Sequence, residues 1–431
     1  MGRISFVPRG APPLHVQIVL SLVTAVFCGL FLGSDVKIAG IALTSIYHFI
    51  GTAFLNALKM LIVPLILSSI ITGVTGMKSG RELGRLGTLT IVYYILTSLL
   101  AILTGLVLVH ILEPGLKGGL PVGPSLGLEK LPQEVANKIS AHGAGDIAEV
   151  FLRMIPPNIV KAASEGQMLG IIFFGIVAGL SMTQLRTEPA VRTLIHFWEG
   201  LFKVMMLMTE WVLALAPIGI FGLVAGVTAS TGLSAFYPLM WFFVSVFSAL
   251  LIHGSITLPL LLRIAGIKPL RHIRAVLPAL LTAFSTASSS ATLPVTLECL
   301  EKRAKIPNRI TSFVLPLGAT VNMDGTALYE CVAAMFLAQA YGLKLSFVQQ
   351  FTVVLIALLT SIGVAGIPAA SLVAITVILA AIGLPPNAIA PLLLVDRILD
   401  MCRTSVNVFS DSCGAALIHS LEKRTENPGM G

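Results

Sequence analysis

Charge is the scarcest property of this sequence. Of its 431 residues only 11% are Asp, Glu, Lys or Arg, against roughly 25% in an ordinary soluble domain. This shortage excludes an ordinary cytosolic enzyme, whose surface needs charge, and an intrinsically disordered chain, which is rich in charge and poor in apolar residues.

Cysteine is also rare. Five cysteines stand singly, with no Cys-x-x-Cys pair among them: Cys28, Cys299, Cys331, Cys402 and Cys413. A secreted disulfide scaffold and a structural zinc site are therefore excluded, and we expect five reduced, buried thiols.

Apolar residues dominate, at 56% hydrophobic with a mean hydropathy of +0.93. Because a helix that crosses a bilayer needs about 20 mostly apolar residues, we predict an all-α polytopic membrane protein with eight spans. The first apolar run is longer than the core of a signal peptide and lacks a small-residue cleavage pattern, so we interpret it as a retained span. The second contains Pro64, near which we expect a kink or tilt. The first six predicted spans cover 16–33, 41–75, 86–112, 168–182, 194–227 and 236–262.

The net charge of +8 is best interpreted as membrane topology and not as nucleic-acid binding. Lys and Arg concentrate in segments that the predicted spans place on one side: before residue 16, at 78–85, 186–192, 263–274 and 423–424. The positive-inside rule makes that side cytoplasmic. We therefore expect both termini in the cytoplasm, residues 113–166 as an external loop, and a location in the plasma membrane, the inner membrane of a bacterial cell.

Two apolar segments in the last third of the chain are interrupted by small and polar residues. The segment 275–297 is interrupted by a run of Ser and Thr, and the segment 351–384 by a Gly- and Pro-containing stretch at 361–368. A long helix that carries Asn and Asp follows each of them. Such paired interruptions are typical of inverted-repeat transporters. We predict two re-entrant helical hairpins whose tips meet near the middle of the membrane.

Acidic residues in apolar sequence point to function, because charge inside a membrane is costly. On the last helix they form a stripe: Asp396, Asp400, Arg403 or Thr404, Asn407 and Asp411 recur at steps of three or four residues. One polar face on an otherwise apolar helix is expected to turn toward a cavity inside the protein.

The chemistry of this stripe suits an amino acid with an acidic side chain. Arg403 offers a planar fork for a carboxylate, and Asp400, one turn earlier, offers a partner for an ammonium. Asn407 and Thr404 offer hydrogen bonds to a second carboxylate. Asp324 and Asp411, near Asn and Gly residues, provide the oxygen ligands that hard cations such as sodium take.

Simpler interpretations exist for each feature. The serine triplet at 288–290 is more often a helix-packing element than a nucleophile. A nucleophilic serine needs a nearby histidine as its base, and the histidine nearest in sequence is His272, in the basic segment 263–274. Arg403 and Asp400 alone also fit a structural ion pair, and Glu330 a simple contact between helices. Four histidines in apolar surroundings are interpreted as packing residues: His48, His110, His196 and His253. Convergence of two hairpins, two Asn/Asp helices and one arginine favours transport.

Four motifs, in this order, resemble those of a known family. They are Ser288-Ser289-Ser290-Ala291-Thr292-Leu293-Pro294, then Asn322-Met323-Asp324-Gly325-Thr326, then Ala365-Gly366-Ile367-Pro368, and finally Asp400, Arg403, Thr404, Asn407 and Asp411. Over nearly its whole length the chain resembles the dicarboxylate/amino acid:cation symporter family, which includes the glutamate and aspartate transporters.

The resemblance implies a glutamate-transporter-like fold of eight spans and two hairpins in inverted repeats, assembled as a homotrimer in the lipid bilayer. It implies a transport core that moves across the membrane against a static scaffold. The implied divisions are 1–86 (scaffold helices), 87–166 (a transport-domain helix and the external loop), 167–267 (two scaffold helices and one transport-domain helix), 268–420 (the transport core) and 421–431 (a cytoplasmic tail).

The resemblance also implies ligands. L-glutamate or L-aspartate would be held by Ser288, Ser289, Ser290, Thr326, Ala365, Gly366, Ile367, Pro368, Asp400, Arg403, Thr404 and Asn407. One sodium site would comprise Gly318, Asn322, Asn407 and Asp411. A second would comprise Tyr94, Thr97, Ser98, Asn322 and Asp324, and a third Thr320, Met323, Ser361, Ile362 and Val364. Sodium is then a co-transported ligand, with no cofactor and no enzyme activity expected.

Choices within the family sharpen this hypothesis. Arg403 matches members with acidic substrates, Asp400 argues against the C4-dicarboxylate branch, and Glu330 matches an acid linked to proton carriage. An additional family arginine is replaced by Ala287 or Met401, and no substitute is evident in the sequence, so potassium counter-transport is not predicted. The alternatives are a carrier of neutral amino acids or C4-dicarboxylates, a channel, and an intramembrane hydrolase that uses the serines.

Overall fold

The computed structural model describes residues 12, 14–32, 36–38, 40–76, 81–128, 152, 155–165, 167–363 and 370–426. These residues are mostly helical, as the composition predicts. Two antiparallel ribbons are the only strands among them: β1 (Lys37–Ile38) pairs with β2 (Ile41–Ala42), and β3 (Leu116–Lys117) with β4 (Leu120–Pro121). The predicted all-α class is therefore confirmed in outline.

Two helical stretches within the described ranges are long and apolar enough to cross a membrane, Leu86–Leu112 and Ala216–Ile264. Four further apolar helices are shorter: Val16–Leu32, Val63–Thr75, Gly170–Gln184 and Phe347–Ser361. Three of the six, Val16–Leu32, Val63–Thr75 and Leu86–Leu112, fall within predicted spans, and Gly170–Gln184 and Phe347–Ser361 overlap a predicted span and a predicted hairpin arm. Ala216–Ile264 instead runs through residues 228–235, where the sequence predicts a break between two spans. The count of eight spans stays a prediction.

One group of helices packs around α2 (Leu43–Thr75), which runs unbroken through Pro64. It contacts α7 (Met168–Gln184), α8 (Pro189–Ala214) and α9 (Ala216–Thr231), and α9 also packs on α1 (Leu14–Leu32). The predicted span 194–227 is thus two helices, divided at Leu215 because Pro217 favours the first turn of a new helix. The short α6 (Ile159–Ser164) contacts α7.

Small residues allow the close packing of this group. A Cβ at Gly222 would lie 2.8 Å from the carbonyl oxygen of Tyr47 and 2.9 Å from the backbone nitrogen of Gly51. Gly219 lies directly against the ring of Phe54. Small residues at helix crossings are how membrane helices bring their backbones together.

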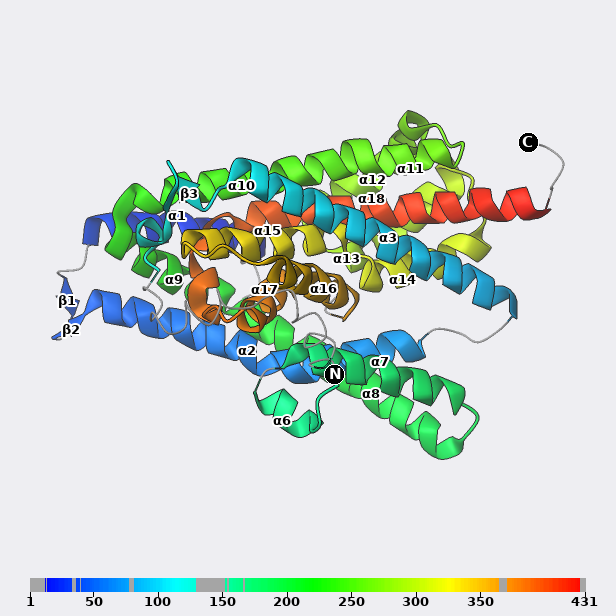
Figure 1. The fold of residues 1–431 in the computed structure, drawn as a ribbon, viewed down its shortest axis with the longest axis horizontal. Coiled ribbons are helices and arrows are strands. Elements are labelled where there is room, and N and C mark those ends of the chain that lie inside the picture. Colours follow the sequence, from blue (N-terminus) through cyan, green and yellow to red (C-terminus); the bar gives the residue numbers. More distant parts are fainter. Residues whose placement is uncertain are drawn as a thin grey trace.

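The remaining helices surround α15 (Asp324–Ala340), which is buried from Asp324 to Ala338 on every side. It contacts α3 (Arg81–Leu112), α10 (Phe236–Ile252), and α18 (Leu393–Glu426). A helix that is buried on every side lies in the core of the protein. Figure 1 shows α15 and α18 side by side in the middle of the molecule, with α10 and α12 along one edge and α7 and α8 along the other.

Both interrupted segments form pairs of helices. In the first, α12 (Pro269–Thr286) and α13 (Ser289–Glu298) pack against each other across a break at Ala287 and Ser288. In the second, α16 (Phe347–Gly363) packs against α17 (Ala370–Ala381), and the tip at 364–369 lies outside the described residues. The pairing agrees with the predicted hairpins, and their re-entry into the membrane stays a prediction.

The helix expected after the first pair is also interrupted. It consists of α14 (Asn308–Val321) and α15, joined by Asn322 and Met323 in non-helical conformations with ψ of 91° and 60°. The side chain of Asn322 donates hydrogen bonds to α18, so tertiary contacts hold this link open. Short turns complete the chain: η1 (Gly123–Leu126), η3 (Gly232–Ala235), η4 (His253–Thr257), α11 (Leu258–Ile264), η5 (Cys299–Arg303) and η6 (Pro386–Leu392).

Candidate functional site

Arg403 is the most deeply buried cation of the described chain, with 1% of its side chain exposed. Its Nη2 donates to Asp400 Oδ1 at 2.9 Å and its Nη1 to Asp396 Oδ1 at 3.1 Å. Its Cζ lies 3.9 Å from the ring centroid of Tyr329 on α15. The two carboxylates more than offset its charge, and the ring adds a cation–π contact. The ion pair with Asp400 that the sequence allowed as an alternative is therefore present.

One turn later, Asn407 joins α18 to the start of α15. Its Nδ2 donates to Thr326 Oγ1 at 3.2 Å, and its Oδ1 accepts from the backbone N–H of Gly325 at 2.8 Å. A Cβ at Gly325 would lie 2.9 Å from the carbonyl oxygen of Arg403, so glycine is needed for this approach. Thr404 donates to the carbonyl of Asp400 within its own helix, at 2.8 Å. Five predicted substrate residues thus meet in one place: Thr326, Asp400, Arg403, Thr404 and Asn407.

The serine triplet begins α13. Ser288 caps the helix by accepting from the N–H of Ala291 at 3.2 Å, and Ala287 before it adopts a left-handed conformation with φ of 49°. Ser289 donates to the carbonyl of Ala319 at 3.1 Å, which ties the first pair of helices to α14, and Ser290 is exposed. Within the described ranges none of the three serines bonds a histidine. The hydrolase alternative therefore gains no support.

Asp324 is fully buried at the start of α15. Its Oδ1 accepts from Ser98 at 2.8 Å, and its Oδ2 accepts from Ser410 at 2.6 Å and lies 3.1 Å from His253 Nε2. Helices far apart in sequence, α3 and α18, therefore converge on this carboxylate.

Asp411 forms the other half of this region. Its Oδ1 accepts from Asn322 Nδ2 at 2.9 Å. A Cβ at Gly318 would collide with the carboxylate of Asp411 and the hydroxyl of Tyr94, so only glycine permits the contact. Tyr94 donates its hydroxyl to the carbonyl of Val314 at 2.7 Å. Predicted residues of two sodium sites are thus contiguous.

The donor set of this cluster suits a hard cation. The buried Oδ1 of Asn322 has no hydrogen-bond donor within the described part of the chain, and no Lys or Arg there pairs with Asp324 or Asp411. Two buried carboxylates and a free amide oxygen, with His253 beside Asp324 and no Lys or Arg paired to either carboxylate among the described residues, are unfavourable unless a cation or a proton joins them. Oxygen ligands alone are what sodium-like ions take.

The other predicted ligands are placed less fully. Thr97 is buried and donates to the carbonyl of Tyr93 at 3.0 Å, and Ser361 is buried on α16 and donates to the carbonyl of Leu358 at 2.8 Å. Met323 lies buried in the link before α15. The backbones of Thr320 and Ile362 are helical. Five predicted residues lie outside the described residues: Val364, Ala365, Gly366, Ile367 and Pro368.

Glu330 is 1% exposed and accepts from Thr360 Oγ1 on α16 at 2.7 Å. The contact joins α15 to the second helix pair. A buried carboxyl group with a hydroxyl partner agrees with either a proton site or the simple interhelical contact that the sequence allowed.

Sequence patterns missed several of these contacts. His253, expected to be a packing residue, contacts Asp324 because the π-helical turn η4 brings it toward α15. Tyr93 donates to the carbonyl of Ser410 at 3.0 Å. Thr360 and Ser410 each directly precede a predicted ligand, which is the signal that would have found them.

Arg397 is a further residue that the sequence pattern left out. Its Nη1 lies 3.5 Å from Asp400 Oδ2, so Asp400 stands between two arginines. The signal was its spacing, three residues before Asp400 and seven before Thr404, on the same helical face. The absence of an arginine at Ala287 and Met401 is therefore not an absence of a second arginine from this region.

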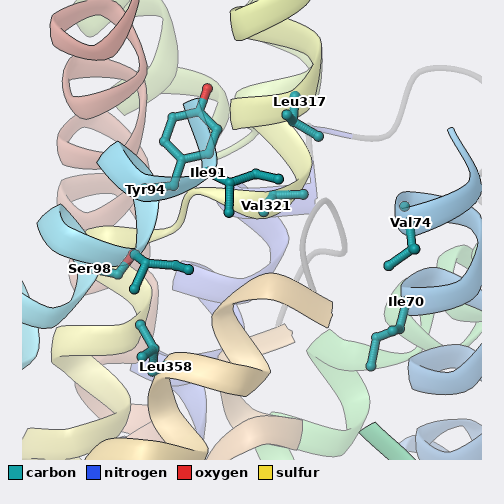
Figure 2. A pocket seen from close by; sticks show the side chains of 10 residues that line it. Ile70, Val74, Ile91, Tyr94, Ser98, Leu317, Val321 and Leu358 are labelled. Atoms are coloured by element: carbon teal, nitrogen blue, oxygen red, sulfur yellow. The ribbon is translucent and has the colours of Figure 1, made fainter. Parts of the chain in front are cut away.

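A narrow crevice of about 90 Å³ lies between α2 and the helices α3, α14 and α16. Figure 2 shows Ile70 and Val74 of α2 facing Ile91, Leu317, Val321 and Leu358 across it. The polar atoms of Tyr94 and Ser98, which also line it, are bonded to Val314 and Asp324. The crevice is thus apolar and borders the carboxylate cluster.

Comparison with known proteins shows the family of this chain. The model of the sodium:dicarboxylate symporter family matches residues 14–421. The chain is 33% identical to the proton/glutamate-aspartate symporter of Escherichia coli, over 95% of this chain and 92% of that protein. It is 36% identical to an excitatory amino acid transporter of Caenorhabditis elegans (95% and 88%) and 31% identical to the proton/sodium-glutamate symport protein of Bacillus caldotenax (94% and 94%). The chain therefore belongs to the sodium:dicarboxylate symporter family.

Proposed function

We propose that this chain is a secondary symporter that imports an acidic amino acid, L-glutamate or L-aspartate, together with sodium. The observation that carries the proposal is the meeting of two clusters on α15 and α18. Arg403 and Asp400 form one, and Asp324 and Asp411 with the free amide oxygen of Asn322 form the other. The names of the relatives agree with both substrates.

In this proposal each polar side chain has a role. Arg403 binds the side-chain carboxylate, held in place by Asp396 and Tyr329. Asp400 binds the ammonium group. Asn407, Thr326 and the serines at the start of α13 bind the second carboxylate, with the N-terminus of α13 adding a favourable dipole.

Sodium and substrate are coupled through the break between α14 and α15. Asn322 contacts Asp411 on one side of the break, while Gly325 and Thr326 contact Asn407 on the other. A cation that orders Asn322 and Asp324 therefore also orders Thr326 and Asn407, the two side chains beside the break that bind the substrate. Differential affinity of this kind is what thermodynamic coupling requires.

The transport core moves as a unit against a scaffold, with the divisions given above, in a homotrimer of the plasma membrane with both termini cytoplasmic. The apolar crevice between α2 and the helices α3, α14 and α16 supports this division, because an interface without polar partners slides without breaking hydrogen bonds. The hairpin tips, including residues 364–369, would close the site.

Glu330 would carry a proton in addition to sodium. It is buried, its partner Thr360 belongs to the second hairpin, and the names of two relatives include proton symport. Carriers of neutral amino acids or C4-dicarboxylates remain the second candidate, which Arg403 and Asp400 together disfavour.

Uptake into proteoliposomes tests the proposal. Radiolabelled L-aspartate and L-glutamate are offered with an inward sodium gradient, then with a proton or potassium gradient alone. We expect saturable uptake that requires sodium. Arg403→Cys should abolish it, whereas Arg309→Cys, which removes an exposed arginine paired with Glu422, should not. Uptake without sodium, or full uptake by the Arg403 variant, would overturn the assignment.

A further inference from the structure

The first three turns of α18 carry four charges, and three of them, Arg397, Asp400 and Arg403, alternate positive, negative, positive at steps of three residues. Arg397 Nη1 lies 3.5 Å from Asp400 Oδ2, and Arg403 Nη2 lies 2.9 Å from Asp400 Oδ1. Each oxygen of the carboxylate therefore faces a different guanidinium. The spacing of three residues on either side places the two arginines on opposite flanks of Asp400.

The two arginines differ in how firmly they are held. Arg403 is 1% exposed, makes two short contacts with carboxylates and stacks on Tyr329. Arg397 is 19% exposed and makes one long contact. Its Nε is buried without an acceptor within the described part of the chain. A guanidinium has five N–H donors in a planar fork, so Arg397 retains most of its capacity for another acceptor.

We propose that Arg397 is a second carboxylate-binding residue of the substrate site, so that Arg397, Asp400 and Arg403 match the carboxylate, ammonium and carboxylate of an acidic amino acid. This inference rests on the proposed function of that site. It adds a residue that determines specificity to the single arginine assigned above.

The charges of the helix support the assignment. Asp396, Arg397, Asp400 and Arg403 sum to zero. With Arg403 as the one available cation, a second substrate carboxylate would face Asp396 and Asp400, and like charges at short range in a partly buried site repel. Arg397 removes this repulsion.

The same arrangement selects against neutral amino acids. A substrate with one carboxylate leaves one arginine without a substrate anion, so that this arginine keeps only its contacts with the carboxylates of α18, in a partly buried site. Leaving a charged group unpaired costs more than a weak contact gains. Specificity for acidic substrates would then arise from both arginines.

Two half-amides of aspartate test the inference. L-asparagine lacks the side-chain carboxylate and L-isoasparagine lacks the α-carboxylate, while both keep the ammonium. Binding of L-aspartate and of each half-amide is measured by calorimetry, in sodium, on the full-length protein and on Arg397→Gln and Arg403→Gln. We expect Arg397→Gln to weaken L-aspartate binding by about 10- to 100-fold, the range for loss of a charge-assisted hydrogen bond. Arg397→Gln should bind one of the half-amides with the same affinity as the unaltered protein, and Arg403→Gln should bind the other half-amide with unchanged affinity.

The remaining outcomes distinguish failure of the role of Arg397 from failure of the proposed substrate site. Equal weakening of all three ligands by Arg397→Gln, no weakening, or sensitivity of both variants to the same half-amide would overturn the role of Arg397. Unchanged L-aspartate binding by Arg403→Gln would instead overturn the substrate site itself. Arg397→Lys keeps the charge and should lose less affinity than Arg397→Gln, and undiminished half-amide binding shows that the glutamine variant is folded.

Discussion

The helices around α2 and the helices around α15 are stabilised in different ways. The first group has an apolar core of residues such as Tyr47, Phe54 and Val224, and glycines bring its backbones together. In the second, five charged side chains other than histidine are buried, and all those described as buried lie on α15 or α18: Asp324, Glu330, Asp396, Arg403 and Asp411.

This difference separates stability from ligand binding. Apolar packing contributes to the free energy of unfolding through contacts between side chains, and it is sensitive to changes in side-chain volume. Buried charges are costly to fold unless they are paired, so they are retained where they serve another purpose. Changes around α2 should therefore alter stability, and changes on α15 and α18 should alter affinity.

The largest effect is expected for Asp411→Asn. The change keeps the shape of the side chain but removes a negative charge beside Asn322, so the cluster attracts sodium less. We expect the sodium concentration that half-saturates L-aspartate binding to rise about tenfold or more, by roughly 1.4 kcal/mol for each factor of ten. Glu298→Gln, at an exposed pair with Lys302, is the matched control and should leave it unchanged. An unaltered sodium requirement in Asp411→Asn would remove the cluster from the cation pathway.

An effect of a different kind, on stability and not on the sodium requirement, is expected for Gly222→Ala. The added methyl group would meet the backbone of Tyr47 and Gly51, which cannot move aside cheaply. Overpacking of this kind costs about 1–3 kcal/mol, so the melting temperature should fall while the Kd for L-aspartate of the folded protein stays the same. Gly200→Ala on α8, where a Cβ meets nothing within 4 Å, should leave the Kd unchanged and should not lower the melting temperature, because alanine favours a helix over glycine. A loss of affinity in Gly222→Ala would break the contrast between the two groups.

The smallest effect is expected for an exposed carboxylate, Glu301, that accepts hydrogen bonds from side chains. The carboxylate of Glu301 accepts from Thr311 Oγ1 at 2.7 Å and from Asn308 Nδ2 at 2.8 Å, and these hydrogen bonds, Thr311 first, lower the pKa of Glu301 below its ordinary value of 4.5. A lowered pKa stabilises the fold above the ordinary pKa, and the contribution is lost as pH falls through the lowered value.

Thr311→Val should therefore raise the pKa of Glu301 toward 4.5. The melting temperature of the variant should lie slightly below that of the unaltered protein at pH 7. The part of this difference that comes from Glu301 should shrink as the pH falls below 4.5. Melting curves of both proteins from pH 7 to pH 3 measure it. A gap of constant size would mean that the carboxylate contributes nothing.

Much of the fold and of the site follows from one-dimensional pattern. The apolar runs predict the helices, and the interruptions at 285–292 and 361–368 predict the helix pairs. Helical spacing alone brings Asp400, Arg403 and Asn407 onto one stripe, and the structure places them together. Predictions that depend on a single helix succeed because its geometry is fixed by the backbone.

The sequence pattern predicts helix breaks and contacts between different helices less well. The pattern of 194–227 gives no division at Leu215, and the helix after residue 307 reads as continuous although contacts from Asn322 to α18 hold it open. His253 resembles a packing residue because nothing near it in sequence is charged, and its partner Asp324 is 71 residues away.

The sequence by itself determined that this is a helical, apolar chain with a few buried charges and a family-specific set of polar residues. Tertiary structure alone decided which polar groups on different helices meet. Asp324 gathers Ser98, His253 and Ser410 from three helices, and Gly318 allows Tyr94 to approach Asp411. The physical reason is that backbone periodicity sets which side chains share a face, whereas the partners of that face depend on how helices pack across long sequence separations.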